Sequence, residues 1–278
     1  MKKIDMKSIG LTEGFVREAG AYEGLNVGRV SSQHKDMYSV ITEAGEFIAE
    51  VSGKIRYHAR SLEEYPAVGD FVMMDRTDNS GGNAVIHHVL ARKSAFIRKA
   101  AGTSKDVQVV ASNIDTVFIC MSLNNDFNLR RLERYLSIAW DSGATPVVVL
   151  TKSDLCDDLE KRLGDVSSMA IGVDVLVTTS TSDDGYLSVK RYIYGGQAVA
   201  FIGSSGVGKS TLINRLAGED TLDTSGIRDD GKGIFVCCRT KTDVTVMYIK
   251  EVVNDGIVEE VHRRLDRIDI DGILDSGY

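Results

Sequence analysis

The residues with the clearest chemical potential form a glycine-rich stretch, Gly203-Ser204-Ser205-Gly206-Val207-Gly208-Lys209-Ser210. Its three glycines let backbone amides approach a polyphosphate, because no Cβ stands in the way. In a phosphate-binding loop of this spacing, the lysine reaches the β and γ phosphates and the serine hydroxyl binds Mg²⁺. We therefore expect Lys209 and Thr211 to contact a nucleotide and Ser210 to hold Mg²⁺. The alternative is a chance turn rich in Gly and Ser.

A shorter stretch, Thr151-Lys152-Ser153-Asp154, resembles the guanine-reading sequence of GTPases. A carboxylate at Asp154 can accept hydrogen bonds from N1 and N2 of guanine, a donor pair that adenine lacks, while Lys152 would lie over the base. Thr151 stands where asparagine is usual, which predicts a weaker tie to the phosphate loop. An ordinary GTPase has this stretch after the phosphate loop, so its position here indicates a circular permutation. The alternative is a solvated turn that caps the next helix.

The hydrophobic pattern predicts the elements that must position both loops. Apolar runs at 146–150 and 198–202 precede the guanine-reading stretch and the phosphate loop, as buried strands would. Helical spacing at 128–140 and 211–217, with a further strand at 116–121, indicates a parallel α/β domain. We also expect a strand at 174–178 and a helix at 186–194, with Thr179 and Ser180 at a weak second base-contacting loop.

The N-terminal region has a different pattern, with short alternating runs at 29–40, 45–51, 69–74 and 83–90. Runs of this kind between Gly, Asp and Asn turns predict a small β-barrel of the oligonucleotide-binding class. Basic residues are distributed along it, and we expect RNA contacts at four of them: Arg92, Lys93, Arg98 and Lys99. Aromatic side chains interleave with them (Tyr38, Phe47, Tyr57 and Phe96), although single aromatics more often belong to a core.

Composition limits the remaining possibilities. The chain has 278 residues, 43% of them hydrophobic, and a formal net charge of -7, which disfavours general nucleic-acid binding but leaves room for a local basic face. No apolar stretch approaches the ~20 residues of a membrane span, and the N-terminus lacks the apolar core of a secretion signal, so we expect a cytoplasmic protein that spans no membrane. The four cysteines show neither a disulfide framework nor zinc-ligand spacing. We expect a monomer.

Residues 25 to about 233 resemble the ribosome-small-subunit-dependent, circularly permuted GTPases of the RsgA type. Besides the two loops, the resemblance rests on 40–54, 66–70, 92–102, 113–115 and 127–135. It implies a GTP hydrolase with Mg²⁺ that binds the small ribosomal subunit and its rRNA late in assembly. It also implies an N-terminal extension (1–24), an oligonucleotide-binding barrel (25–102), an incomplete permuted GTPase domain (103–233) and a divergent tail (234–278).

The resemblance weakens after Gly231-Lys232-Gly233. The family's His-Thr-Thr-Thr switch, its Asp-x-Pro-Gly strand end and its Cys/His zinc domain are not recognisable here, so we assign no zinc ligands and no catalytic residue. Two stretches, 223–226 and 269–272, have the Asp-x-x-Gly letters of a GTPase switch, but their positions in the chain are poor for that role. Residues from about 235 to 278 instead resemble a fragment of a spore germinant receptor A-subunit. Within them we expect a strand at 244–249 in place of the missing sheet strand, and a helix at 254–265 beyond it.

Three functions are compatible with these patterns. One is a GTPase of small-subunit assembly. A second is a truncated or fused remnant that binds GTP or GDP but hydrolyses it poorly, because phosphoryl transfer depends on positioning that the switches would supply. The third is an unrelated phosphate-loop ATPase or kinase, which would not require Asp154.

Overall fold

The computed structural model describes residues 3–77, 81–99, 107–182, 184–217, 234–239 and 244–249. It separates into two compact units, Met1–Ile114 and Asp115–Tyr278. The expected helix at 254–265 and the switch look-alikes at 223–226 and 269–272 lie outside the described residues.

The first unit contains a closed barrel of five strands in the order β1-β2-β3-β5-β4, which confirms the predicted fold class. The strands are β1 (Asn26–His34), β2 (Met37–Thr42), β3 (Gly45–Val51), β4 (Phe71–Met74) and β5 (Ala84–Val89). Inward residues of these strands form one core, including Val30, Val40 and Ile86. The single apolar run expected at 29–40 is two strands, because Lys35 turns the chain with a φ of 53°.

The N-terminal residues pack on this barrel. A 3-10 helix (Met6–Ile9) and α1 (Glu13–Ala19) contribute Met6, Ile9 and Phe15 to a second core that includes Phe71. Between β3 and β4 lie the short helix α2 (Gly53–His58) and a 3-10 helix (Leu62–Glu64).

The unit ends with a hairpin of β6 (Ala95–Lys99) and β7 (Val107–Ser112). The boundary expected at 102/103 falls between these paired strands, whereas the structure divides the chain after Ile114.

The second unit is built on a sheet of six strands in the order β10-β9-β8-β11-β12-β13. Its strands are β8 (Thr116–Ser122), β9 (Thr145–Thr151), β10 (Asp174–Val177), β11 (Ala198–Ile202), β12 (Ile234–Arg239) and β13 (Val244–Ile249). The first four pair in parallel, as predicted, while β12 and β13 add as antiparallel neighbours. Strands β12 and β13 thus belong to the sheet of the second unit.

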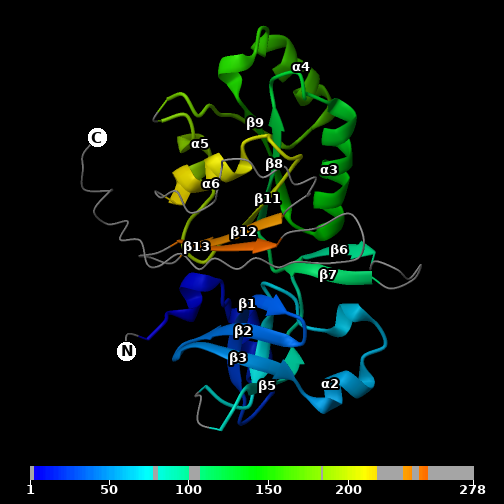
Figure 1. Cartoon of the computed structure of the whole chain (residues 1–278), viewed down its shortest axis with the longest axis vertical. Coiled ribbons are helices and arrows are strands. Elements are labelled where there is room, and N and C mark those ends of the chain that lie inside the picture. Colours follow the sequence, from blue (N-terminus) through cyan, green and yellow to red (C-terminus); the bar gives the residue numbers. More distant parts are fainter. Residues whose placement is uncertain are drawn as a thin grey trace. The chain divides into compact units, whose positions relative to one another are not determined.

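Helices cover both faces of this sheet (Figure 1). On one side lie α3 (Leu129–Ser142) and α4 (Leu159–Met169), and on the other lie α5 (Leu187–Lys190) and α6 (Lys209–Ala217). The second pair buries Val189, Leu212 and Ile213 against Phe118 and Phe201 of the sheet. The parallel strands β8, β9 and β11 therefore end at the same edge, where an open α/β sheet places its ligands.

Candidate functional site

The phosphate-binding loop connects β11, all of whose residues are buried, to α6. Gly203, Gly206 and Gly208 have φ values of 150°, 74° and 98°, which other residues rarely adopt. A Cβ at Gly203 would also collide with the backbone of Cys120 on β8. The three predicted glycines are thus required by the shape of the loop, and α6 begins directly after them with its amide groups facing the loop.

Lys209 is buried, and its ammonium group donates to the carbonyls of Gly203 and Ser204, both at 2.7 Å. Burial lowers the pKa of Lys209 below its ordinary value, although the neighbouring Cys120 acts in the opposite direction. No carboxylate pairs with this ammonium among the described residues. A desolvated cation with only carbonyl partners would be stabilised by an incoming anion, which is the property a phosphate site needs.

The guanine-reading stretch lies directly against the phosphate loop. The buried Thr151 donates from Oγ1 to the carbonyl of Val207 at 2.5 Å, and Lys152 donates from Nζ to the carbonyl of Gly206 at 2.7 Å. Lys152 itself has a φ of 57°, which turns the chain sharply after β9. The weak tie expected for Thr151 is therefore not found, because a hydroxyl donates to the loop carbonyl in place of the usual amide.

Asp154 is exposed in the turn that follows and accepts a hydrogen bond from Thr179 Oγ1 at 2.6 Å. Ser153 donates its backbone amide to the carbonyl of Thr178 at 3.2 Å. The loop after β10 thus orients the proposed base-reading carboxylate. Thr179 had only a weak signal in the sequence, and the hydrogen bond to Asp154 is what assigns it to the site.

Two arginines at the site have no signal in the sequence. Arg131, in the first turn of α3, donates to Ser204 Oγ at 2.8 Å. Arg215 on α6 donates to the carbonyls of Ser180 and Ser182, at 2.6 and 2.7 Å. Both join segments that are far apart in the chain, so only the folded arrangement identifies them.

The residues fit a nucleotide with Mg²⁺. Ser210 follows Lys209 in the first turn of α6 and is partly exposed, so its hydroxyl is available to a cation beside the phosphates. Ser205 and Gly206 are exposed at the tip of the loop. Among the described residues, no group of three or more His, Cys, Asp or Glu side chains is arranged to hold a metal by itself.

The four residues of the first unit that were predicted to contact RNA differ in their surroundings. Arg92 is engaged inside its unit, where Nε and Nη2 bind both carboxylate oxygens of the fully buried Asp70 at 2.8 and 2.7 Å. It also donates to the carbonyls of Glu63 and Tyr65, at 2.6 and 2.8 Å. The prediction of Arg92 as an RNA contact is therefore replaced by a structural role. Lys93 is exposed, while the side chains of Arg98 and Lys99 lie outside the described residues.

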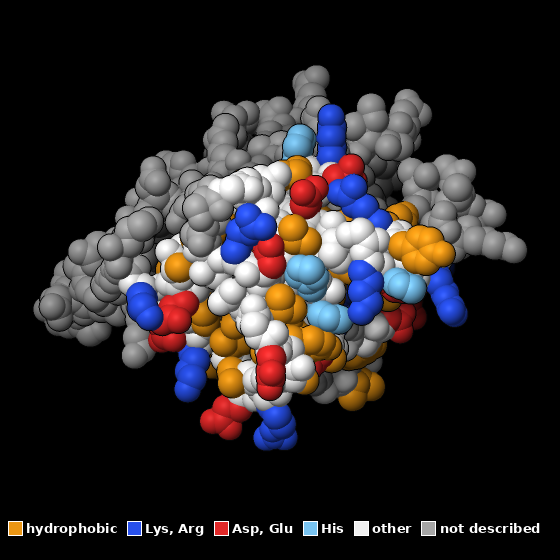
Figure 2. All heavy atoms as spheres, turned by 90° about the horizontal axis from the view of Figure 1, so that it is seen from below, with side chains coloured by type: hydrophobic (Ala, Val, Ile, Leu, Met, Phe, Trp, Pro, Cys, Tyr) orange, Lys and Arg blue, Asp and Glu red, His pale blue; other side chains and the backbone are white. Residues whose placement is uncertain are grey.

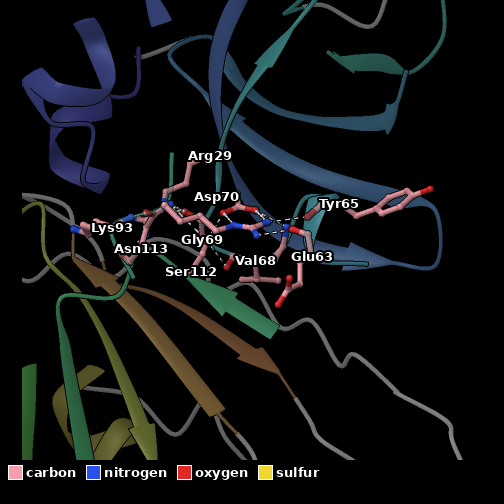
Figure 3. Close-up of polar contacts among 11 residues, drawn as sticks. Arg29, Glu63, Tyr65, Val68, Gly69, Asp70, Lys93, Ser112 and Asn113 are labelled. Atoms are coloured by element: carbon pink, nitrogen blue, oxygen red, sulfur yellow. Dashed lines mark hydrogen bonds and ion pairs between the residues drawn. The ribbon is translucent and has the colours of Figure 1, made fainter. Parts of the chain in front are cut away.

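The same network continues through the first unit (Figure 3). Ser112 donates to Asp70 Oδ1 at 2.5 Å, and Asn113, whose φ is 55°, donates from Nδ2 to the carbonyl of Gly69 at 3.1 Å. The buried Arg29 donates to the carbonyls of Gly69, Ile9 and Asn113. These bonds join the barrel, its N-terminal segment and the end of the hairpin.

Within the part of the chain that the structure describes, no helix is both long and apolar enough to cross a membrane.

Comparison with known proteins agrees with this geometry. The family model described as RsgA GTPase matches residues 89–255. A small ribosomal subunit biogenesis GTPase RsgA 2 of Lactiplantibacillus plantarum is 48% identical over 231 residues, which are 83% of this chain and 65% of that protein. Another of the same name from Listeria monocytogenes is 41% identical, covering 83% of this chain and 64% of that protein. The chain thus spans slightly less than two thirds of the length of these relatives.

Solved structures give the same fold. YjeQ from Thermotoga maritima matches with a TM-score of 0.55 and 25% identity, covering 69% of this chain and 65% of that one. YloQ, described as a circularly permuted GTPase, matches with a TM-score of 0.52 and 19% identity, covering 76% of this chain and 68% of that one.

The family match corrects the expectation for the end of the chain. It extends to residue 255, well past the point near 233 where the resemblance was expected to stop. Together with the placement of β12 and β13 in the sheet, this leaves the spore germinant receptor resemblance without support. From the family match and the strong identity to curated relatives, we conclude that the chain belongs to the RsgA GTPase family.

Proposed function

We propose that this chain binds GTP with Mg²⁺, hydrolyses it, and acts in the assembly of the small ribosomal subunit. The observation that carries the proposal is the pair of hydrogen bonds from Thr151 and Lys152 to the carbonyls of the phosphate loop. They hold a base-reading carboxylate and a phosphate cradle in one site, although the two stretches occur in reversed order along the chain. The curated relatives that it matches are named for the same activity and the same ribosomal partner.

The chemistry follows from the chain's own residues. Backbone amides of residues 203–210 and the N-terminus of α6 would bind the phosphates, while Lys209 supplies a positive charge. Asp154, oriented by Thr179, would select guanine, and Lys152 would cover the base. Bound Mg²⁺ would neutralise charge on the β and γ phosphates, and Ser210 is the side chain placed to hold it.

Base selection can be tested by exchanging the carboxylate of Asp154 for an amide. Asp154→Asn should weaken GTP binding and preserve or improve binding of xanthosine triphosphate, because an amide can donate to the O2 of xanthine. Binding of both nucleotides would be measured by calorimetry. An unchanged preference for guanine would refute the assignment of this stretch.

For the RNA partner, we propose the exposed face of α2 in place of Arg92. This helix buries none of its residues, and Tyr57 is 85% exposed, whereas Tyr38 and Phe96 belong to the core. Lys54, Arg56 and Arg60 flank Tyr57 and are also exposed. An exposed aromatic ring among basic side chains is suited to stacking an unpaired base while the cations meet phosphates.

The surface of the first unit carries charges of both signs. Figure 2 shows Lys and Arg side chains scattered around a group of histidines, with acidic side chains between them. Beside α2, a groove of about 380 Å³ runs from Ile55 to Arg92 and includes Glu63 and Glu64 in its lining. Carboxylates there would repel phosphates, so the backbone of an RNA would follow α2 and not this groove.

The experiment for this face compares Tyr57→Ala and the double change Lys54→Glu, Arg56→Glu with the unchanged chain. Both variants should lose affinity for small ribosomal subunits in sedimentation, while GTP affinity stays the same. Ile171→Ala, at an 80% exposed apolar side chain of the other unit, serves as the matched control. If both α2 variants bind small ribosomal subunits as well as the unchanged chain does, this face is not the RNA contact.

A second candidate is a protein that binds the nucleotide but hydrolyses it slowly. It is favoured by the sequence, in which the residues of β12 directly follow Gly231-Lys232-Gly233 and the His-Thr-Thr-Thr segment of the family is not recognisable. Both candidate functions include GTP binding, so a single-turnover measurement of the hydrolysis rate distinguishes them.

A further inference from the structure

Arg131 stands at the edge of the sheet where the phosphate loop emerges. The loop after β8 leads to α3, whose N-cap Asn128 accepts from the backbone amide of Arg131 at 3.0 Å. Because β8 and β11 are parallel neighbours, the segments that follow them emerge side by side. The first turn of α3 is therefore close enough for Arg131 to reach the phosphate loop.

Its guanidinium makes two kinds of contact. Nη1 donates to Ser204 Oγ at 2.8 Å and to both carboxylate oxygens of Asp126 at 3.0 Å. Asp126 is held in turn by its backbone amide, which donates to Asn124 Oδ1 at 3.0 Å. The carbonyl of Ser204 accepts from Lys209 at 2.7 Å. Two cations from different helices therefore converge on Ser204.

Helix stability does not explain this arginine. A positive charge in the first turn of a helix is unfavourable, because the N-terminus already carries a partial positive charge. Within the described part of the chain, Nε and Nη2 of Arg131 have no partner, and the side chain is 25% exposed. The group thus presents unused donors beside a phosphate loop.

We propose that Arg131 is a positioning residue for the phosphate loop, one that favours a nucleoside triphosphate over the diphosphate. This inference rests on the proposed binding of GTP. The lysine of a phosphate loop reaches the β and γ phosphates. Since Lys209 also bonds to Ser204, Arg131 would lie near the phosphates that Lys209 reaches. A triphosphate carries additional negative charge there, and the guanidinium fork suits phosphate oxygens.

The experiment measures GTP and GDP affinities of the full chain and its variants by calorimetry with Mg²⁺. Arg131→Gln should weaken GTP by about tenfold, the size of a lost charged hydrogen bond, and GDP by less than about threefold. Arg131→Lys should restore part of the difference because it keeps the charge. Arg130→Gln changes the adjacent exposed arginine and should alter neither affinity. Thermal melting of each variant checks that it is folded.

A double-mutant cycle with Ser204→Ala tests the route of action. If Arg131 acts through Ser204, the combined variant should lose no more GTP preference than the larger single loss. Equal weakening of GTP and GDP by Arg131→Gln, or no change in either, would overturn the inference while leaving nucleotide binding intact. Failure of the unchanged chain to bind either nucleotide would overturn the proposed function, and this inference with it.

Discussion

At the scale of single residues, the site depends on hydrogen bonds to the carbonyls of the phosphate loop. Thr151, Lys152 and Lys209 all donate to that loop, which ties its carbonyls to neighbouring side chains. A threonine can serve at position 151 because its short side chain is buried against Val207. The departure from the usual asparagine therefore changes the donor and preserves the contact.

Removal of the Thr151 hydroxyl should weaken GTP binding. Thr151→Val keeps the shape but leaves the Val207 carbonyl unpaired, which should cost about 1 kcal/mol and lower GTP affinity about fivefold. Thr151→Ser is the matched control, since it keeps the hydroxyl and should bind GTP nearly as well. Calorimetric titration measures both, and equal affinity for all three chains would contradict the role given to this contact.

At the scale of elements, the barrel is held by a buried ion pair. Arg92 is the charged partner of Asp70, which has no exposed surface. Loss of one partner of such a pair leaves an uncompensated charge in the interior. The position is therefore one where substitution acts on folding of the first unit before it acts on any ligand.

Arg92→Leu should accordingly lower the free energy of unfolding by about 3 kcal/mol. Arg60→Leu, at an exposed arginine of the same unit, should change it by less than about 0.5 kcal/mol. Denaturant titration followed by circular dichroism gives both values. A stable Arg92→Leu chain that had lost only its affinity for ribosomal subunits would restore the RNA-contact interpretation.

At His88 on strand β5, we expect the folding stability to depend on pH. Burial, together with the nearby charges of Lys54 and His87, lowers the pKa of His88 below 6.5. The unfolded chain then binds the proton more tightly, so stability rises with pH up to about 6.5 and falls on acidification. His88→Gln should flatten this dependence between pH 5 and about 6.5 in urea titrations at several pH values. An unaltered slope would show that another group is responsible.

At the scale of the whole molecule, much could be predicted from the sequence. The barrel, the parallel sheet and the permuted order follow from local runs and from two loops of fixed spacing, and the structure confirms that fold. The contacts of Arg92, Arg131 and Thr179 could not be predicted, because each joins segments distant in the chain. Strand β13 confirms the strand expected at 244–249, whereas β12 was not predicted, because the residues after Gly233 were assigned to another family.

The rearranged halves of this site are proposed to form one GTP-hydrolysing unit. The most direct test is single-turnover hydrolysis of GTP by the purified 278-residue chain, with and without small ribosomal subunits. If the two halves do form one unit, the chain binds GTP tightly and the subunits increase its rate of hydrolysis. Bound GTP that stays intact with and without subunits would contradict the claim.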